Sequence, residues 1–370
     1  MRNSDSSLLL IGNNHLVDYP TPASISYGYG FGSLAGMALL FQVITGVFLG
    51  MQYTAEIYNS FVSIDVLMRE TWGGWLIRYY HSNGASLFFI VVYLHIIRGL
   101  YYGSYIQPRG VLWGSGVFIL LIMIITAFLG YVLPWGQMSL WGATVITNLL
   151  SAIPFVGNSL VIWLWGGYSV GASTLLRFYS LHFLFPFIIL GAVLLHLGLL
   201  HINGSSNRLG VEDKSDKLVF YPYCVIKDLL VLLVLLVSYA LLVVLVPNVL
   251  GHSDNSIQAN AMFTPAHIVP EWYFLPFYGI LRSVPYKLGG VMLMLFSILG
   301  LLLLPGLADT GIRSNRFKPF GKLGIWFFIG CVLMLGYLGQ EVVAWPFDFT
   351  SKVVSLGYFV IILGLLPRLI

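Results

Sequence analysis

The sequence predicts an all-α integral membrane protein with eight transmembrane helices. Hydrophobic residues make up 58% of the chain and charged residues 9%, whereas a soluble domain contains about 25% charged residues. Eight stretches are long and apolar enough to cross a hydrocarbon core of about 30 Å. They are Phe31–Tyr53, Trp75–Tyr102, Gly110–Leu133, Leu175–Leu200, Ile226–Val246, Gly290–Leu307, Leu323–Gln340 and Val353–Leu366. Cys224 and Cys331 lie in separate segments without a CxxC partner, which excludes a disulfide framework.

The basic residues predict the orientation of these spans. Eight spans put both termini on one side. The termini and even-numbered loops carry Arg2, Arg109, Arg208, Lys214, Lys217, Lys227, Arg313, Arg316, Lys318, Lys322 and Arg368. The odd-numbered loops carry Arg69, Arg282, Lys287 and Lys352. Because basic loops stay in the electrically negative compartment, the termini should face a bacterial cytoplasm or a mitochondrial matrix. This loop bias accounts for the net charge of +4, and no nucleic acid partner is expected.

The chain divides into three expected regions. Residues 1–30 should lie along the negative-side surface, because Met1–Tyr19 is polar apart from the short apolar run Leu8–Ile11, and no cleavable signal is evident. Residues 31–210 hold the first four spans, a four-helix bundle. Residues 211–370 hold the last four, with a Pro-Glu-Trp-Tyr loop. Spans six to eight contain no histidine and read as scaffold.

Two spans each carry a pair of histidines at the same interval. His81 and His95 are fourteen residues apart in the second span, and His182 and His196 in the fourth. Fourteen residues of α-helix rise about 21 Å and turn to within about 40° of the starting direction. Each span therefore shows two imidazoles on nearly one face, at two depths of the membrane.

Paired imidazoles at matched depths favour two metal sites. A lone histidine in an apolar helix is more often a core residue, but burying four without strong partners would cost several kcal/mol each. Two axial imidazoles produce a six-coordinate, low-spin haem suited to electron transfer. We expect His81 with His182 near the positive side and His95 with His196 nearer the negative side. These pairs would hold two non-covalent b-type haems about 21 Å apart.

Glycines repeat the histidine interval in the two remaining spans of the bundle. Gly32 and Gly46 lie in the first span, and Gly116 and Gly130 in the third. Ordinary small-residue helix packing is one explanation. Two pairs at the histidine interval favour flat macrocycles pressed against the glycines.

Arg78 and Arg98 lie near opposite ends of the second span. Arginine inside a span is costly and usually paired, so each could contact the propionates of one haem. The alternative is snorkelling to lipid headgroups.

Two long loops on the positive side carry little charge and many aromatic residues. Residues 134–170 contain no charged side chain but four tryptophans, with helical pattern in Gln137–Ser151 and Asn158–Trp165. Such a loop should fold as short helices that roof a cavity, or it could serve only as an interfacial anchor.

In the second loop, Tyr278 would share a face with Glu271 if Glu271–Ser283 is helical. Glu271 could exchange protons, or it could simply stabilise a helix N-terminus.

A second polar group is expected at the negative-side surface. His201 ends the fourth span, while Lys227 and Asp228 open the fifth. They could bind and protonate a polar headgroup, or they could form a solvated rim. A lipophilic carrier of two electrons and two protons, such as a quinone, fits both the Glu271 and the His201 regions.

Several strings resemble the cytochrome b family of the respiratory ubiquinol–cytochrome c oxidoreductase (complex III), mitochondrial type. They are Phe31-Gly-Ser-Leu, Arg78-Tyr-Tyr-His-Ser-Asn-Gly-Ala-Ser, Gly99-Leu-Tyr-Tyr-Gly-Ser-Tyr, Gly130-Tyr-Val-Leu-Pro-Trp-Gly-Gln-Met, Trp141-Gly-Ala-Thr-Val-Ile-Thr-Asn-Leu-Leu and Pro270-Glu-Trp-Tyr. The resemblance covers essentially the whole chain. It departs at Gly171, where an acidic residue is expected in the animal form, and at Ile202, where Glu is common.

The resemblance implies a role for each site. His81 and His182 would hold the low-potential haem, and His95 and His196 the high-potential one. The quinol-oxidation site on the positive side would include Glu271, Tyr278, Tyr131 and Gly142. The quinone-reduction site on the negative side would include Ser33, His201, Lys227 and Asp228. The implied activity is quinol oxidation with electron transfer across the membrane and proton translocation (the Q cycle).

The resemblance also implies the surroundings of the chain. An iron–sulfur protein, a cytochrome c-type subunit, a second copy of the complex, lipids and ubiquinone are the expected partners. A mitochondrial inner membrane, with the termini in the matrix, is favoured over a bacterial plasma membrane because the 370 residues are compact. Two other functions fit the sequence less well. A secondary transporter would leave the histidine and glycine intervals unexplained, and a dihaem membrane anchor would not need a Glu271 region.

Overall fold

The structure is a computed structural model that describes residues 12–212, 215–308 and 311–368. Within those residues, eight helical segments are long and apolar enough to cross a membrane, which confirms the predicted fold class. They are α2 (Phe31–Gly50), α4 (Gly74–Tyr101), α5 (Gly110–Val132), α8 (Ala172–Asn203), α9 (Tyr223–Leu245), α11 (Lys287–Leu299) with η6 (Gly300–Leu303) and α12 (Leu304–Leu307), α13 (Pro319–Gln340), and α14 (Phe347–Phe359) with η8 (Val360–Leu365) and α15 (Leu366–Arg368).

Two of these helices, α13 and α14, begin more than a turn before the predicted span. The last one begins at Phe347 and not at Val353. Its first turns contain Asp348 and Lys352, whose charged groups pair at 3.5 Å across one helical turn. Polar residues that satisfy each other in this way extend a helix beyond its apolar stretch, so hydropathy underestimates its length.

Shorter elements connect the spans. They are η1 (Asn13–Val17), β1 (Pro20–Pro22), η2 (Tyr27–Gly30), α3 (Ser60–Glu70), α6 (Gln137–Asn148), η3 (Leu149–Ala152), α7 (Gly157–Trp165), β2 (Lys217–Val219), η4 (Ser253–Ser256), η5 (Trp272–Phe274), α10 (Leu275–Arg282) and η7 (Asn315–Phe317). The sequence predicted α6 with η3 and α7, but neither α3 nor the β1–β2 pair. The helix considered over Glu271–Ser283 is divided into η5 and α10.

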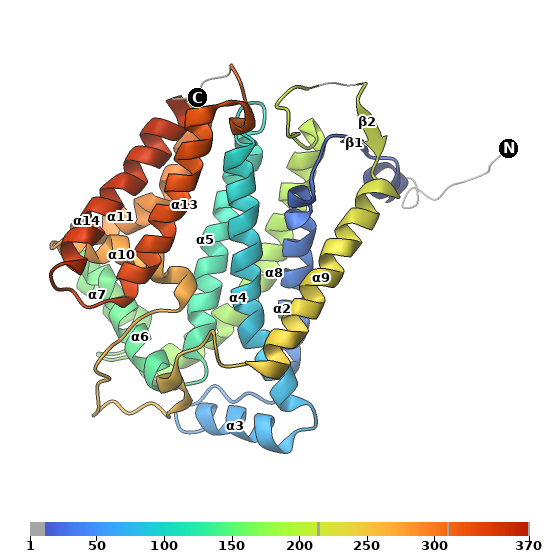
Figure 1. Cartoon of the computed structure of the whole chain (residues 1–370). Helices are drawn as coiled ribbons and strands as arrows, with labels where there is room; N and C mark the ends of the chain where they lie inside the picture. The colour runs from blue at the N-terminus through green and yellow to red at the C-terminus, as the bar shows by residue number, and fades with distance from the viewer. Residues whose placement is uncertain (1–11, 213–214, 309–310, 369–370) are drawn as a thin grey trace.

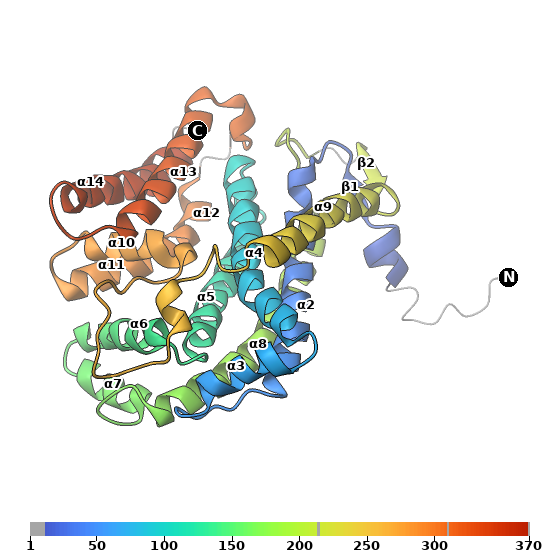
Figure 2. The ribbon, with the colours of Figure 1, turned by 60° about the horizontal axis from the view of Figure 1, so that its bottom comes forward.

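The first four membrane helices form one bundle. α2 packs against α4 and α5 packs against α8, and the four helices lie side by side in both views (Figures 1 and 2). α4 and α8 run in the same direction, away from the end of the molecule that carries α3, α6 and α7 (Figure 1). Equivalent positions along α4 and α8 therefore lie at similar depths.

Of the C-terminal helices, α10 and α14 pack against α13, whereas α9 packs against α4 and α2. Leu335 of α13 and Ile280 of α10 are completely buried there. Gly279 and Gly339 allow this close approach, because a Cβ on Gly279 would lie 2.7 Å from the backbone oxygen of Leu335. The glycines bring the backbones of α10 and α13 into contact.

The loop between α9 and η5 is tied to the start of α6. The side chain of Gln137 donates to the Phe263 carbonyl at 3.1 Å and accepts from the Asn260 amide at 2.9 Å. Asn255 accepts hydrogen bonds from both the amide and the hydroxyl of Ser139, at 2.9 and 3.0 Å. Two loops that are far apart in sequence thus form one cover over this end of the bundle.

The opposite end is closed by a short antiparallel ladder between β1 and β2, in which Pro20 pairs with Val219 (Figure 1). Next to it, Glu212 bridges two arginines, Arg109 at 3.0 Å and Arg313 at 2.9 Å. Arg109 is buried, so this bridge joins the bundle to the segment that precedes α13.

Candidate functional site

The four histidines form two pairs of facing rings between α4 and α8. The ring centres of His81 and His182 are 6.2 Å apart, and those of His95 and His196 are 6.5 Å apart. A metal–imidazole bond of about 2 Å on each side, plus about 1 Å from each nitrogen to its ring centre, also adds up to about 6 Å. Both separations therefore fit one metal ion held between the two rings. Among the described residues, no group of three His, Cys, Asp or Glu side chains could hold a metal by itself.

Hydrogen bonds orient the pair near α3. The Thr126 carbonyl lies 2.7 Å from Nδ1 of His182, which must carry the proton to donate to it. The Thr45 hydroxyl lies 2.9 Å from Nδ1 of His81. With Nδ1 occupied, Nε2 is the nitrogen left for a metal, which is the usual arrangement of a metal-binding histidine.

The pair near β1 is held differently. Nδ1 of His196 lies 2.7 Å from the Ser115 hydroxyl. Nδ1 of His95 instead lies 3.0 Å from the guanidinium of Arg98, whose Nε is buried and has no hydrogen bond to any described residue. Arg98 also lies over the ring of Tyr29, 4.8 Å from its centre. An unpaired, buried guanidinium nitrogen beside this histidine suits an acidic group of a ligand.

Each glycine at the repeated interval faces an imidazole. A Cβ on Gly46 would lie 3.0 Å from Cε1 of His81, and one on Gly130 would collide with the ring of His182. The corresponding distances are 3.4 Å both from Gly32 to His95 and from Gly116 to His196. These glycines therefore leave room for the rings, and their role differs from the backbone contact made by Gly279.

Glu271 lies in a recess with about 320 Å³ of empty space. Its lining residues are Phe128, Tyr131, Val132, Gly142, Ala143, Ile146, Val269, Pro270, Glu271 and Phe274. Glu271 is the residue before η5, but its side chain makes no capping hydrogen bond, which argues against a purely structural capping role.

The surroundings of Glu271 favour its protonated form. Burial raises the pKa of its carboxyl group to about 7, although Tyr131 and Arg78 act in the opposite direction. The Tyr131 hydroxyl lies next to this carboxyl group but forms no hydrogen bond of ordinary geometry with any described residue. Because the charge of Arg78 lowers the pKa of Glu271, Arg78 acts electrostatically on the recess.

α4 positions the Glu271 segment directly. The indole of Trp272 donates to the Ser86 hydroxyl at 3.0 Å, and the Tyr93 hydroxyl donates to the Tyr273 carbonyl at 2.7 Å. The same helix carries His81 and His95. The recess is therefore fixed relative to the histidine pairs, a link that sequence patterns did not reveal.

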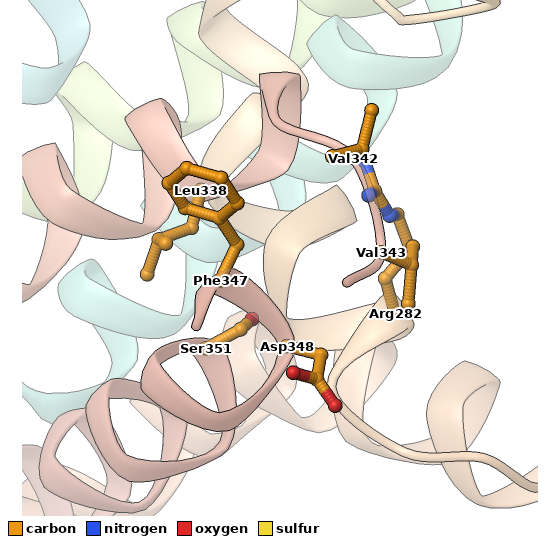
Figure 3. Close-up of a pocket in the computed structure, with 7 residues that line it drawn as sticks. All are labelled: Arg282, Leu338, Val342, Val343, Phe347, Asp348 and Ser351. Atoms are coloured by element: carbon orange, nitrogen blue, oxygen red, sulfur yellow. The ribbon is translucent and has the colours of Figure 1, made fainter. Parts of the chain in front are cut away.

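Tyr278 does not line this recess. Its ring lies 5.2 Å from the guanidinium of Arg282, which donates to the carbonyls of Gly339 and Glu341 at 2.8 and 2.5 Å. Arg282 lines a different pocket, with about 210 Å³ of empty space, together with Asp348 (Figure 3). The helical spacing that would bring Tyr278 to Glu271 is broken, because η5 precedes α10.

The predicted polar group on the opposite side separates into two clusters. In the first, Ser33 donates to the Asp228 carboxylate at 2.5 Å. A Cβ on Gly30 would lie 2.8 Å from the same carboxylate. Lys227 turns away to donate to the Ile25 carbonyl at 3.0 Å. All of these contacts join α9 to the segment that begins α2.

The second cluster surrounds His201. Its ring packs edge-on against Tyr19, with centres 4.4 Å apart, and against His15, with centres 4.8 Å apart. Sequence reasoning did not select Tyr19 or His15, since nothing local connects them to a residue more than 180 positions away.

Comparisons with known proteins agree over nearly the whole chain. The family model "Cytochrome b/b6/petB" matches residues 16–204, and "Cytochrome b(C-terminal)/b6/petD" matches residues 258–359. Cytochrome b of Chondrus crispus is 54% identical over 100% of this chain and 97% of its own length. Cytochrome b of Marchantia polymorpha is 56% identical over 94% of this chain and 86% of its own length.

A solved structure described as a hyperthermophilic respiratory complex III contains a similar chain. It is 31% identical, has a TM-score of 0.92, and the match covers 98% of this chain and 97% of that one. Sequence and fold lead to the same conclusion: this chain belongs to the cytochrome b family.

Proposed function

We propose that His81 with His182, and His95 with His196, would hold the irons of two b-type haems. The observation that carries this proposal is the pair of ring separations, 6.2 and 6.5 Å, each flanked by glycines. Family membership makes the chain the cytochrome b subunit of a quinol–cytochrome c oxidoreductase and implies haem binding. When bound, the haems supply one-electron transfer between the two sides of the membrane.

Two arginines would bind the haem propionates. Arg98 is the stronger candidate because its Nε is buried without a partner among the described residues. Arg78 would act at the other haem, near His81, and its charge also opposes the rise of the pKa of Glu271. Arg78 would thereby connect the haem at that depth with the recess.

The recess around Glu271 would be the quinol-oxidation site. Tyr131 and Gly142 line it together with Glu271. A carboxyl group with a pKa of about 7 can accept a proton from a quinol and release it to water near neutral pH. Tyr278 lies outside this recess, with its ring against Arg282.

The clusters at the other end would form the quinone-reduction site. His201 would bind one end of a quinone headgroup, and Asp228, held by Ser33, the other. Lys227 would support this site through its contact with Ile25. Histidine and carboxylate side chains can deliver the two protons that a quinone takes up when it is reduced.

The loop charges and the family support the wider setting. The excess of basic residues supports an orientation in which the end with β1 and β2 faces the negative side, which in a mitochondrial inner membrane is the matrix. The similar structure belongs to a respiratory complex III. An iron–sulfur protein, a cytochrome c-type subunit, a second copy of the complex and lipids would be the partners of this chain.

The reduced-minus-oxidised spectrum of the purified complex tests this proposal. We expect two distinguishable b-type signals, each reducible by quinol from one side. A single signal, or none, would contradict the assignment of four ligands. Two signals that quinol cannot reduce would instead indicate a dihaem anchor without quinone sites of its own.

A further inference from the structure

The hydroxyl group of Tyr19 is buried and forms no hydrogen bond with any residue that the structure describes. Leaving a buried polar group unpaired is unfavourable, so such an atom usually has a water or a ligand as its partner. Tyr19 lies outside the membrane-spanning helices and directly before β1. Nothing in the family resemblance assigned it a role.

The backbone around Tyr19 is firmly held. The Phe220 amide donates to the Tyr19 carbonyl at 3.0 Å, and the Tyr221 amide donates to the Val17 carbonyl at 3.1 Å. These bonds extend the β1–β2 ladder to the residues that precede β1. The ladder thereby fixes the position from which the Tyr19 side chain extends.

The Tyr19 side chain reaches the end of α8. Its ring packs edge-on against His201 at 4.4 Å with an interplanar angle of 87°. Its hydroxyl would lie 3.5 Å from a Cβ on Gly204. Gly204 has φ +72°, a left-handed conformation that suits glycine and leaves this position without a side chain. The hydroxyl and the imidazole therefore lie together at the end of α8, beside a position that carries no side chain.

The neighbouring Arg109 already has hydrogen-bond and ion-pair partners. Arg109 donates to the carbonyls of Gly204 and Asn203 at 2.9 and 3.3 Å and pairs with Glu212. His15 packs on the other face of the cluster, against the ring of His201. Burial raises the pKa of the Tyr19 phenol, so the phenol stays protonated and is a hydrogen-bond donor near neutral pH. Its missing partner is therefore an acceptor.

We propose that Tyr19 is a substrate-binding residue of the quinone-reduction site, whose hydroxyl donates a hydrogen bond to the quinone carbonyl next to His201. A quinone carbonyl accepts hydrogen bonds and offers no donor, which matches the protonated phenol. Two donors on one oxygen stabilise the negative charge that this oxygen gains when electrons enter the ring. This inference rests on the proposed function of the His201 and Asp228 clusters.

The reaction needs no chemical change in Tyr19. The quinone receives two electrons through the haems and two protons from the negative side, and it becomes quinol. Tyr19 keeps its proton and is neither oxidised nor reduced. It lowers the energy of the charged ring and holds the carbonyl in place.

Tyr19→Phe in the complete complex is the direct test, because it removes only the hydroxyl and keeps the ring on His201. The matched control is Tyr221→Phe, which removes the hydroxyl of an exposed tyrosine beside the same ladder. Haem reduction through the negative side is measured with the positive-side site blocked. Infrared difference spectra of quinone labelled with ¹³C at its carbonyls report directly on hydrogen bonding.

We expect Tyr19→Phe to raise the KM for negative-side quinol about 3- to 10-fold, the value of one hydrogen bond. One carbonyl stretching band should shift to higher frequency, and positive-side quinol oxidation should not change. Tyr221→Phe should match the unmodified complex in all three measurements. Unchanged carbonyl bands and KM in Tyr19→Phe would overturn the proposal. If the unmodified complex showed no negative-side haem reduction, the proposed function itself would fail.

Discussion

Glycines have different roles in the two halves of this molecule. In the first four membrane helices, Gly46 and Gly130 face the rings of His81 and His182. In the C-terminal helices, Gly279 faces the backbone oxygen of Leu335 on a neighbouring helix. The first arrangement leaves room for side chains that bind something, and the second lets two backbones approach each other. A membrane glycine is therefore interpretable only when the atom it faces is known.

The same contrast extends to the polar residues. Three of the four paired histidines have a hydroxyl or carbonyl partner at Nδ1, so their other nitrogen is presented in a fixed direction. Nδ1 of His95 lies beside the guanidinium of Arg98 instead. In the C-terminal half, Arg282 uses its guanidinium to bind the carbonyls at the end of α13. The proposed site residues lie in the bundle, at Glu271 and at the start of α9, while α10 and α13 support the segment that carries Glu271.

The largest effect should follow from His182→Leu. Without this imidazole one haem loses an axial ligand, so we expect one b-type signal to disappear while the His95–His196 signal is still reduced from the negative side. Low-temperature spectra and the haem-to-protein ratio measure this. Retention of both signals would contradict the pairing of His81 with His182.

Gly130→Ala tests whether the glycines of the bundle act through the histidines. The new methyl group would collide with the ring of His182 and displace it, so we expect the affinity for one haem to fall at least about tenfold, as when the support of a metal ligand is lost. Haem titration of the purified complex is the measurement.

Gly36→Ala is the matched control for that experiment. It adds the same methyl group to the same bundle, but nothing lies within 4 Å of its Cβ. Equal haem loss in both variants would show that the bundle needs glycine for a general reason, and the comparison between the two halves would then fail.

Glu271→Gln probes proton transfer at the recess that the C-terminal half contributes to. The carboxyl group has a pKa of about 7 and must be ionised to accept a proton. The rate of quinol oxidation should therefore fall as the pH drops below about 7. In the glutamine variant the rate should no longer fall in this pH range. Its rate should be about tenfold lower at high pH, because water can replace the carboxylate only in part. If the rate of the glutamine variant still fell below about pH 7, the fall would belong to another titrating group.

Gly339→Ala should affect stability but not the spectrum. The methyl group would collide with the backbone of Leu275 and Gly279, and such overpacking costs about 1–3 kcal/mol. We expect a lower midpoint of thermal unfolding with both haem signals intact. Loss of a haem signal before unfolding would mean that the two halves are less independent than the glycine contacts indicate.

The smallest effect should come from Thr45→Val, which removes the hydroxyl beside Nδ1 of His81. One hydrogen bond is worth about 1 kcal/mol. For a one-electron couple this corresponds to about 40 mV, so the midpoint potential of one haem should move by no more than that. Redox titration measures the shift, and a larger change would indicate that the hydroxyl also positions the ligand.

The sequence determined the eight spans, the two depths of the histidines and the helical stretches of the Trp-rich loop. These features depend on composition and on the geometry of a single helix, so they can be derived locally. Fourteen residues separate His81 from His95 in the sequence, and the helix converts that interval into a distance without help from the rest of the fold. The glycine interval is informative for the same reason.

Only the tertiary structure decided which atoms those residues meet. It placed Tyr278 against Arg282 and outside the Glu271 recess, because a turn of different pitch begins the segment. It brought Tyr19 to His201 and joined Ser33 to Asp228. Such contacts depend on strand pairing, helix tilt and side-chain rotamers across nearly 200 residues of chain. A periodic pattern contains no information about them, because it describes one helix at a time.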